Sequence, residues 1–327
     1  MTGTPEWAWM NGKFMPWAEC TLHIRTQVVM MGGSVFEGIR AYWNDEQKEL
    51  YIFKMREHLE RLRDSAHVMR MQPIAVEELE SVCVRLLELN AFREDVHLVP
   101  TAYLGYGENF LSLSKTRDEG VFVSAIPRPG GKWLEVGKNV RTSSWRRISD
   151  SSMPPRVKAS GNYLNSRWAL QEAWQDGYDD TIILNDRGTV AESAGACVVM
   201  IRNGQVCTPP VTAGILESIT RTTLIKLFGE CLGITVVERE IDRTELYYAD
   251  EVFLCGSGME VVPVVSMDRF VIGNGRKGET TEAIQKIYFD IARGINAVHA
   301  EWRTPIYGRE GSEKGRQSGK HAVQSAS

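Results

Sequence analysis

The chain has 327 residues, of which 43% are hydrophobic and 24% are charged, and it is long enough for two domains of ordinary size. Its 38 basic and 42 acidic residues are mixed along the sequence and give a net charge of -4, which argues against nucleic acid or an acidic membrane as the main partner. No apolar run approaches the roughly 20 residues of a membrane span. The first residues show no basic region followed by an apolar core, so no secretory signal is predicted.

Cysteines and histidines show no spacing typical of a metal site, so no metal is expected. His58 and His67 lie in a segment with helical periodicity, where a structural role is the simpler interpretation. The six cysteines are predicted to be reduced thiols used as small core residues, and a cytoplasmic protein is therefore expected. They are Cys20, Cys83, Cys197, Cys207, Cys231 and Cys255.

The first part of the chain alternates strands and helices. Apolar residues at helical spacing predict helices over 56–70 and 75–90, and strands are predicted over 49–54, 96–107 and 120–127. Two prolines and two adjacent glycines then interrupt the pattern. We therefore predict a small α/β domain over 1–125 and an interdomain linker over 126–138.

The second part is predicted as a larger α/β domain over 139–303. Asn203-Gly204 is typical of a type I′ turn, and it predicts a hairpin over 196–210. The polar, Gly/Ser-rich residues 304–327 are predicted to be a disordered tail. Strands are predicted over 139–147, 179–186, 235–241, 249–257 and 260–268, and helices over 163–176, 218–233 and 280–295.

The segment PPRVKASGNYLNSRWALQEA, residues 154–173, places Lys158 between a stiff, proline-containing approach and a run of very small residues. A lysine that forms a Schiff base must be partly desolvated, so that its amine is neutral often enough to attack a carbonyl. Ala159, Ser160 and Gly161 would leave room for a bulky planar cofactor, and Tyr163 could offer it a phenol. The alternative is an ordinary solvated lysine.

Other residues could support a pyridine-ring cofactor with a phosphate group. Such a ring needs an anion at its nitrogen, and Glu192 lies in a segment that is otherwise poor in charge. A helix that begins near Ser218–Thr220 would offer free N–H groups to the phosphate, with Arg61 as a charged partner. Each feature alone also fits a surface carboxylate, an ordinary helix cap or a solvated helix charge.

Seven motifs occur in the order seen in the fold-type IV (class IV) aminotransferases, which use pyridoxal 5'-phosphate (PLP). The sequence most resembles the branched-chain amino acid aminotransferases, over roughly residues 7–303. The resemblance implies a mixed α/β, two-domain fold, with a small N-terminal α/β domain and a larger C-terminal domain with a barrel-like core of mixed sheets. The motifs are GGSVFEGIRAY, HLERL, KASGNYLNS, ESAGACVVMIRNGQVCTPP, ITR, YYADEVFLCGSGMEVVPV and GNGRKGETT.

The resemblance also implies roles for single residues. Lys158 would form the Schiff base with PLP and move the proton, Glu192 would hold the ring nitrogen, and Tyr163 would contact the phenolic oxygen. The phosphate would be bound by Arg61, Ile219 and Thr220, with Ser257 where the family usually has threonine. The family places its site between the two domains and usually builds it across a homodimer. The substrate-pocket positions are Phe36, Arg40, Gly258 and Met259.

Four further positions depart from the branched-chain pattern, and these four concern the substrate. Met31 stands at or beside a usual tyrosine, His97 and Val99 replace a Tyr-x-Arg pair, and Trp133 replaces an interdomain tyrosine. The usual residues orient the substrate carboxylate, so we expect an altered pocket with the proton-transfer residues intact. His97 is a candidate for the new carboxylate partner.

The function expected from this resemblance is transamination. An amino group would pass from a branched-chain or similar hydrophobic L-amino acid to 2-oxoglutarate in a ping-pong mechanism. The alternatives are a D-amino acid or (R)-amine transaminase, a PLP-dependent lyase of the same fold, and an interaction protein that has kept the fold without the cofactor.

Overall fold

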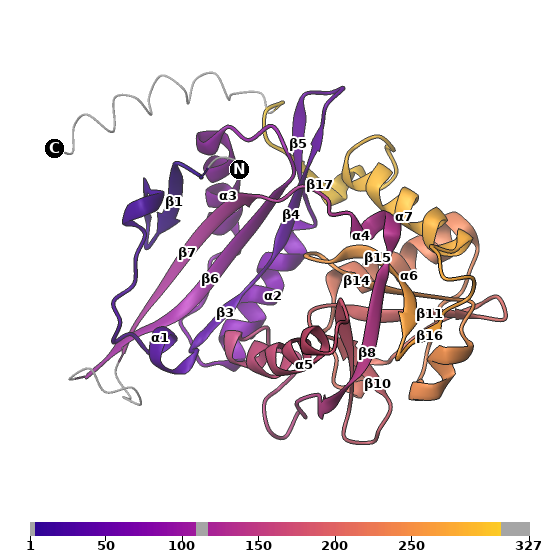
Figure 1. Cartoon of the computed structure of the whole chain (residues 1–327). Coiled ribbons are helices and arrows are strands. Elements are labelled where there is room, and N and C mark those ends of the chain that lie inside the picture. The colour runs from indigo at the N-terminus through magenta and orange to yellow at the C-terminus, as the bar shows by residue number, and fades with distance from the viewer. Residues whose placement is uncertain (1–3, 109–116, 309–327) are drawn as a thin grey trace.

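The computed structural model describes residues 4–108 and 117–308. Their strands form two sheets, one built mainly from the first 127 residues and one from residues 138–271, and Figure 1 shows the two sheets side by side with helices packed against each. A mixed α/β fold with two parts is therefore confirmed.

The first sheet has eight strands within the described residues, in the order β17-β5-β4-β6-β7-β1-β2, with β3 paired to β6. Helices α2 and α3 bury their apolar stripes, including Leu59, Leu62 and Leu87, in the core beside this sheet. The elements are β1 (Trp7–Met10), β2 (Lys13–Pro16), α1 (Gln27–Met31), β3 (Ser34–Phe36), β4 (Ile39–Asn44), β5 (Glu49–Phe53), α2 (Met55–Val68), α3 (Val76–Asn90), β6 (Val96–Gly107), β7 (Arg117–Pro127) and β17 (Arg303–Pro305).

The second sheet has nine strands in the described chain, in the order β10-β9-β8-β15-β14-β11-β12-β13, with β16 on β15. An additional pairing of β10 with β11 closes six of these strands into a barrel, as the resemblance implied. The elements are α4 (Trp133–Val136), β8 (Lys138–Arg146), α5 (Tyr163–Gln175), β9 (Asp180–Leu184), β10 (Val190–Ser193), β11 (Cys197–Arg202), β12 (Gln205–Thr208), α6 (Ile219–Leu232), β13 (Val237–Glu238), β14 (Glu251–Gly256), β15 (Glu260–Met267), β16 (Phe270–Val271) and α7 (Glu279–Ala292).

Local sequence signals explain several element ends. Asn203 and Gly204 both have positive φ, at 50° and 73°, as a type I′ turn requires. Ser218 caps α6 by accepting the N–H of Arg221, and Gly233 ends that helix in the left-handed region at φ 67°. The strand predicted over 235–241 shrinks to the two residues of β13, because only two residues of β12 pair with it.

The C-terminal part of the described chain returns to the first sheet. β17 pairs antiparallel with β5, and Ile306 is fully buried. The Glu49 carboxylate accepts the N–H groups of Ile306, Tyr307 and Gly308. Residues 304–308, which the sequence assigned to a disordered tail, are thus ordered, because their partners lie about 250 positions away and leave no local signal. Residues 309–327 lie outside the described part. The linker predicted over 126–138 holds the end of β7 and the short helix α4.

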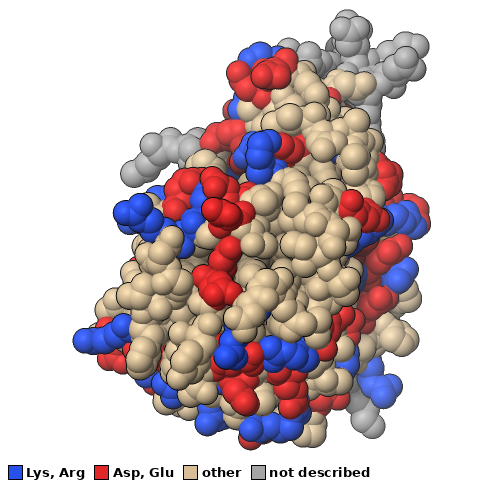
Figure 2. Space-filling view, turned by 90° about the vertical axis from the view of Figure 1, so that its right-hand side faces the viewer, with Lys and Arg blue, Asp and Glu red and all other residues tan. Residues whose placement is uncertain are grey.

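Surface charges, apolar helices, possible metal ligands and cysteines can each be compared with what the sequence predicts. The face in Figure 2 shows basic and acidic side chains interspersed among uncharged areas, without a patch of one sign. In the described residues, no helix is long and apolar enough to cross a membrane, and no group of three His, Cys, Asp or Glu side chains could hold a metal ion. Four cysteines are buried, as predicted for core thiols, whereas Cys20 is half-buried and Cys231 is exposed.

Candidate active site

A cavity of about 180 Å³ lies where elements of the two sheets meet. Its wall on the side of the first sheet comes from β3, α2 and β6, and its other wall comes from the Lys158 segment, β10, the start of α6 and the end of β14. The structure thus brings together residues that are up to 222 positions apart in the sequence. The predicted site residues that line the cavity are Phe36, Arg61, His97, Lys158, Tyr163, Glu192, Ser257 and Gly258.

Lys158 is held by its backbone and points its amine toward Tyr163. Its carbonyl accepts the N–H of Phe36 at 3.1 Å, and its own N–H donates to Ser65 Oγ at 3.2 Å. The buried Asn162 amide donates to the carbonyls of Pro154 and Val157, which fixes the approach to the lysine. Lys158 Nζ donates to the Tyr163 hydroxyl.

The small residues after Lys158 have a different role from the one predicted. Ala159 forms a β-bridge with Val35, and Ser160 Oγ accepts from Ser34 Oγ at 2.7 Å, so this run packs against β3 and does not line the cavity. A Cβ on Gly32 would lie 3.5 Å from Gly161 Cα, which shows that the two backbones approach closely there.

Room for a planar group comes from another pair of segments. Residues 194–197 and 255–258 line the cavity with mostly small side chains. A Cβ on Gly256 would lie 3.3 Å from the Gly195 carbonyl oxygen and 3.6 Å from Ala196. These glycines and alanines leave a wall without large side chains, which suits the flat ring of the predicted cofactor.

Glu192 provides the buried carboxylate that a pyridine nitrogen would require. Its Oε1 lies 2.7 Å from Arg147 Nη2, and its Oε2 accepts the N–H of Leu216 at 3.2 Å. Burial raises the pKa of Glu192, whereas Arg147, the Leu216 N–H and the Lys158 and Arg61 charges lower it. Burial outweighs these contributions, so the pKa of Glu192 is raised overall, and the buried Arg147 makes the largest of the contributions that lower it.

Hydrogen-bond donors that could bind a phosphate gather around the start of α6. The first-turn N–H groups of Ile219 and Thr220 have no acceptor within the helix, as at every helix N-terminus. Thr220 Oγ1 lies 3.3 Å from Ser257 Oγ, and Arg61 reaches the same turn by donating from Nη1 to the Glu217 carbonyl at 2.7 Å. These donors fit a phosphate dianion at this end of the cavity.

A buried carboxylate, Glu37, fixes the orientation of Arg61. Arg61 donates from Nε and Nη2 to the two Glu37 oxygens, both at 2.7 Å, and Glu37 also accepts from His58 Nδ1 at 2.7 Å. Burial raises the pKa of Glu37, but Arg61 and His58 outweigh it and bring the pKa to about 2. His58 Nε2 lies 3.2 Å from Ser257 Oγ, so the network ends at a phosphate-side hydroxyl. His58 is thus satisfied structurally, as predicted, but it also touches the site.

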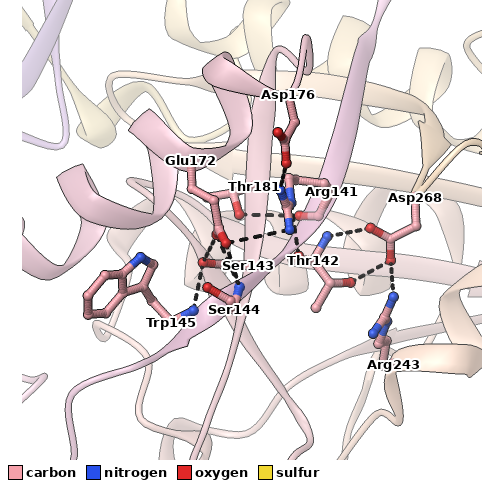
Figure 3. Close-up of polar contacts among 10 residues, drawn as sticks. All are labelled: Arg141, Thr142, Ser143, Ser144, Trp145, Glu172, Asp176, Thr181, Arg243 and Asp268. Atoms are coloured by element: carbon pink, nitrogen blue, oxygen red, sulfur yellow. Dashed lines mark hydrogen bonds and ion pairs between the residues drawn. The ribbon is translucent and has the colours of Figure 1, made fainter.

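A second polar cluster, shown in Figure 3, joins strand β8 to helix α5 through Glu172 and to the turn after β15 through Asp268. The Glu172 carboxylate accepts from Ser143 Oγ at 2.8 Å and from the Ser144 N–H at 3.0 Å. Asp268 accepts from the N–H and the Oγ1 of Thr142, both at 2.7 Å. Because α5 begins at Tyr163 and Arg147 directly follows β8, these contacts hold the backbone that presents two site residues.

The predicted substrate residues divide between this cavity and a neighbouring one of about 220 Å³. Phe36 and His97 line the first cavity, whereas Arg40, Trp133 and Met259 line the second, and Gly258 lines both. Arg40 is only 2% exposed and forms an ion pair with Glu260 at 2.9 Å, so its charge is already neutralised inside the protein.

Two of the predicted substrate residues line neither cavity. Met31 is 53% exposed on the short helix α1. Val99 lies two residues after His97 on β6, where it pairs with Ser124 of β7. His97 itself carries no positive charge near neutral pH, because burial and the nearby cations Arg128 and Arg40 lower its pKa to about 3.

Sequence reasoning missed three charged residues of this region: Glu37, Arg128 and Arg147. Glu37 lies between β3 and β4 and is the only charged residue between Arg25 and Arg40, a signal that could have marked it as a buried ion-pair partner. Arg147 directly follows another arginine at the end of β8, and nothing local distinguishes the two. Arg128 lies in the segment interpreted as a linker.

Replacing Glu37 with glutamine is expected to destabilise the protein by about 3 kcal/mol near neutral pH, since a carboxyl pKa lowered from its ordinary value to about 2 corresponds to roughly that free energy. The depressed pKa stabilises the fold above about pH 4.5, and this stabilisation is lost as the pH falls toward about 2. Urea unfolding of both proteins between pH 6 and pH 3 should show the difference shrinking below pH 4.5. A difference that stays constant over this range would contradict the assignment.

Comparison with known proteins agrees with this geometry. The family described as "Amino-transferase class IV" matches residues 34–267. A probable branched-chain-amino-acid aminotransferase of Aquifex aeolicus is 40% identical to this chain. The alignment covers 92% of this chain and 97% of that protein. The branched-chain-amino-acid aminotransferase of Pseudomonas aeruginosa is 38% identical over 91% of this chain and 96% of its own.

Solved structures show the same likeness. The crystal structure of the branched-chain amino acid aminotransferase from Thermobaculum terrenum in its PLP form superposes with a TM-score of 0.87 at 40% identity, and covers 92% of this chain and 98% of that one. Similarity of this extent, in sequence and in fold, shows common family membership. The chain belongs to the class IV aminotransferases, in the family of the branched-chain-amino-acid aminotransferases.

Proposed function

We propose that this aminotransferase moves the amino group of a branched-chain or similar hydrophobic L-amino acid to 2-oxoglutarate in a ping-pong reaction, with the cofactor held on Lys158. The observation that carries the proposal is the arrangement around one cavity of Lys158 with Tyr163, the Glu192–Arg147 pair and the donors near α6. The relatives named above are branched-chain-amino-acid aminotransferases, which supports the substrate class.

The cofactor is PLP. The donor set fits this molecule: a buried carboxylate for its ring nitrogen, a phenol beside the lysine, and a helix N-terminus with Arg61 for its phosphate. The small residues around Gly195 and Gly256 leave space for the ring. When bound, PLP supplies a carbonyl that takes up the amino group and a protonated ring that withdraws electrons from the substrate's α-carbon.

Each residue then has a proposed task. The amine of Lys158 would hold the cofactor covalently and, once free, would move the α-proton as general base and acid. The Tyr163 hydroxyl accepts a hydrogen bond from that amine. Glu192, beside Arg147, would keep a proton on the ring nitrogen. Arg61, oriented by Glu37, would bind the phosphate.

A D-amino acid or (R)-amine transaminase is the second candidate, favoured by His97 and Val99 at positions where the family usually has Tyr-x-Arg. A lyase of the same fold would use the same lysine but would need no oxo-acid acceptor. Acceptor dependence therefore separates the lyase from both transaminases. The homodimer and the cytoplasmic location stay predictions.

The visible absorption spectrum of the holoenzyme tests the proposal. L-Leucine or L-valine should bleach the cofactor band, and 2-oxoglutarate should restore it. Bleaching only with D-alanine or (R)-1-phenylethylamine would select the second candidate. Product release without any acceptor requirement would indicate the lyase.

Replacement of Lys158 by alanine is expected to lower turnover by a factor on the order of 10³ or more, because the variant lacks both the covalent attachment and the proton carrier. The measurement is steady-state transamination together with cofactor content. Lys286→Ala, at a lysine exposed on α7, serves as the control and should keep full activity. Sustained turnover by the Lys158 variant at a tenth of the normal rate would exclude the lysine as catalyst.

Loss of the Arg147 charge is expected to move the acidic limb of the pH profile to higher pH. The guanidinium lowers the pKa of Glu192, so Arg147→Met should raise that pKa, and the carboxylate should protonate at higher pH by about 1–3 units. The pH dependence of kcat/KM for L-leucine measures the shift. Arg147→Lys, which keeps the charge, should show a smaller shift. Identical limbs in all three proteins would show that Arg147 does not control Glu192.

A further inference from the structure

A cation without a carboxylate partner lies at the boundary between the two cavities. The Arg128 side chain lines both cavities, and its Nη2 donates to the Gly258 carbonyl at 2.9 Å. The side chain is exposed, yet its backbone is fixed on both sides: its N–H donates to the Asp95 carbonyl at 2.7 Å, and its carbonyl accepts from Arg40 Nη1 at 2.6 Å. The backbone that carries this side chain is therefore held in place, unlike the backbone of an arginine on a mobile loop.

The other arginines and lysines around the two cavities already have partners. Arg61 is paired with Glu37, and Arg147 with Glu192. In the second cavity Arg40 is paired with Glu260, and Lys138 lies 2.6 Å from Asp180. Lys158 donates to Tyr163. Among residues 4–108 and 117–308, no carboxylate lies within ion-pair distance of Arg128.

An amino acid substrate and its oxo acid product share one anion, the α-carboxylate, and the cavity must neutralise it. The positions that usually carry Tyr-x-Arg hold His97 and Val99, of which Val99 lines neither cavity and His97 is uncharged near neutral pH. His97 nevertheless lines the first cavity together with Arg128, and a Cβ on Gly38 would lie only 2.7 Å from its Nε2. The imidazole thus closes this wall of the cavity, and another residue must supply the positive charge that neutralises the carboxylate.

We propose that Arg128 binds the α-carboxylate of the substrate and takes over the role of the absent Tyr-x-Arg pair. The assignment rests on the proposed function. A guanidinium has five N–H donors in a planar fork, so Arg128 can keep its bond to Gly258 and still offer paired donors to a carboxylate. Its position beside residues 256–258 lets the wall that faces the cofactor also orient the substrate.

Binding of 4-methylvaleric acid and of its uncharged amide to the holoenzyme tests this assignment. The two ligands have the same carbon skeleton as leucine without the amino group, so the dissociation constants report recognition of the carboxylate without turnover. Arg128→Met should weaken binding of the acid by about 10- to 100-fold and leave the amide unchanged within about twofold. Arg128→Lys should lie between, because it keeps the charge and loses the fork. Arg63→Met, at an exposed arginine of α2 paired with Asp64, is the matched control.

Kinetics with the same variants decide which carboxylate is bound. The KM for L-leucine and the KM for L-glutamate should rise together in Arg128→Met, and the cofactor absorbance and the melting temperature should stay at their normal values. A rise confined to glutamate and 2-oxoglutarate would overturn the proposal, since it would place Arg128 at the distal carboxylate. Unchanged affinity for the acid would also overturn it. Should the unaltered enzyme fail to bleach with any amino acid, the fault would lie with the proposed function instead.

Discussion

Pairing of buried charges is the constraint on which the site depends. Glu37 and Glu192 are both nearly inaccessible to water, and an isolated carboxylate in such a place would take up a proton instead of staying ionised. Arg61 and Arg147 oppose this, each at 2.7 Å from its carboxylate. Arg61 and the Glu192–Arg147 pair line the same cavity, and in the proposed function they would bind the phosphate and the ring nitrogen of PLP.

One of these pairs, Glu37–Arg61, also connects the two halves of the fold. Glu37 directly follows β3 of the first sheet, but the arginine that it orients reaches across to the carbonyl just before α6. Lys158 likewise belongs to the second half, but its carbonyl bonds to Phe36 and its neighbour Ala159 bridges to Val35. The reactive amine is therefore positioned by the first sheet, and the cavity exists only when the two halves are packed together.

The residues proposed to bind the substrate differ in burial and in charge pairing from those proposed to bind the cofactor. The groups proposed to hold PLP are paired and mostly buried, whereas the wall toward the second cavity carries an exposed arginine and an uncharged histidine. A change at His97 or Arg128 can thus alter which molecule is bound without disturbing Lys158 or Glu192. Of the departures that concern the substrate, His97 lines the first cavity and Trp133 the second, whereas Met31 and Val99 line neither.

Much of the candidate site could be predicted from the sequence. The motif around Lys158 marks the lysine, Glu192 stands out as a charge in apolar surroundings, and Ser218 together with the apolar period predicts α6 and its N-terminus. Helices α2 and α3 also follow directly from their amphipathic patterns. These features are local, because a helix cap or an apolar stripe involves residues only a few positions apart.

Contacts between residues far apart in the sequence were decided only by the tertiary structure. The run from Ala159 to Gly161 looked like space for a ring, but pairing with β3 uses it for packing. Arg40 looked available to a substrate, but a carboxylate 220 positions away neutralises it. Arg128, in an apparent linker, lies at the cavity with no carboxylate partner among the described residues. The sequence by itself determined which chemical groups this protein has and which helices and turns it forms, and the packing of the two sheets decided which of those groups remain free to bind a ligand, because a charge is satisfied by whatever partner the fold brings within reach.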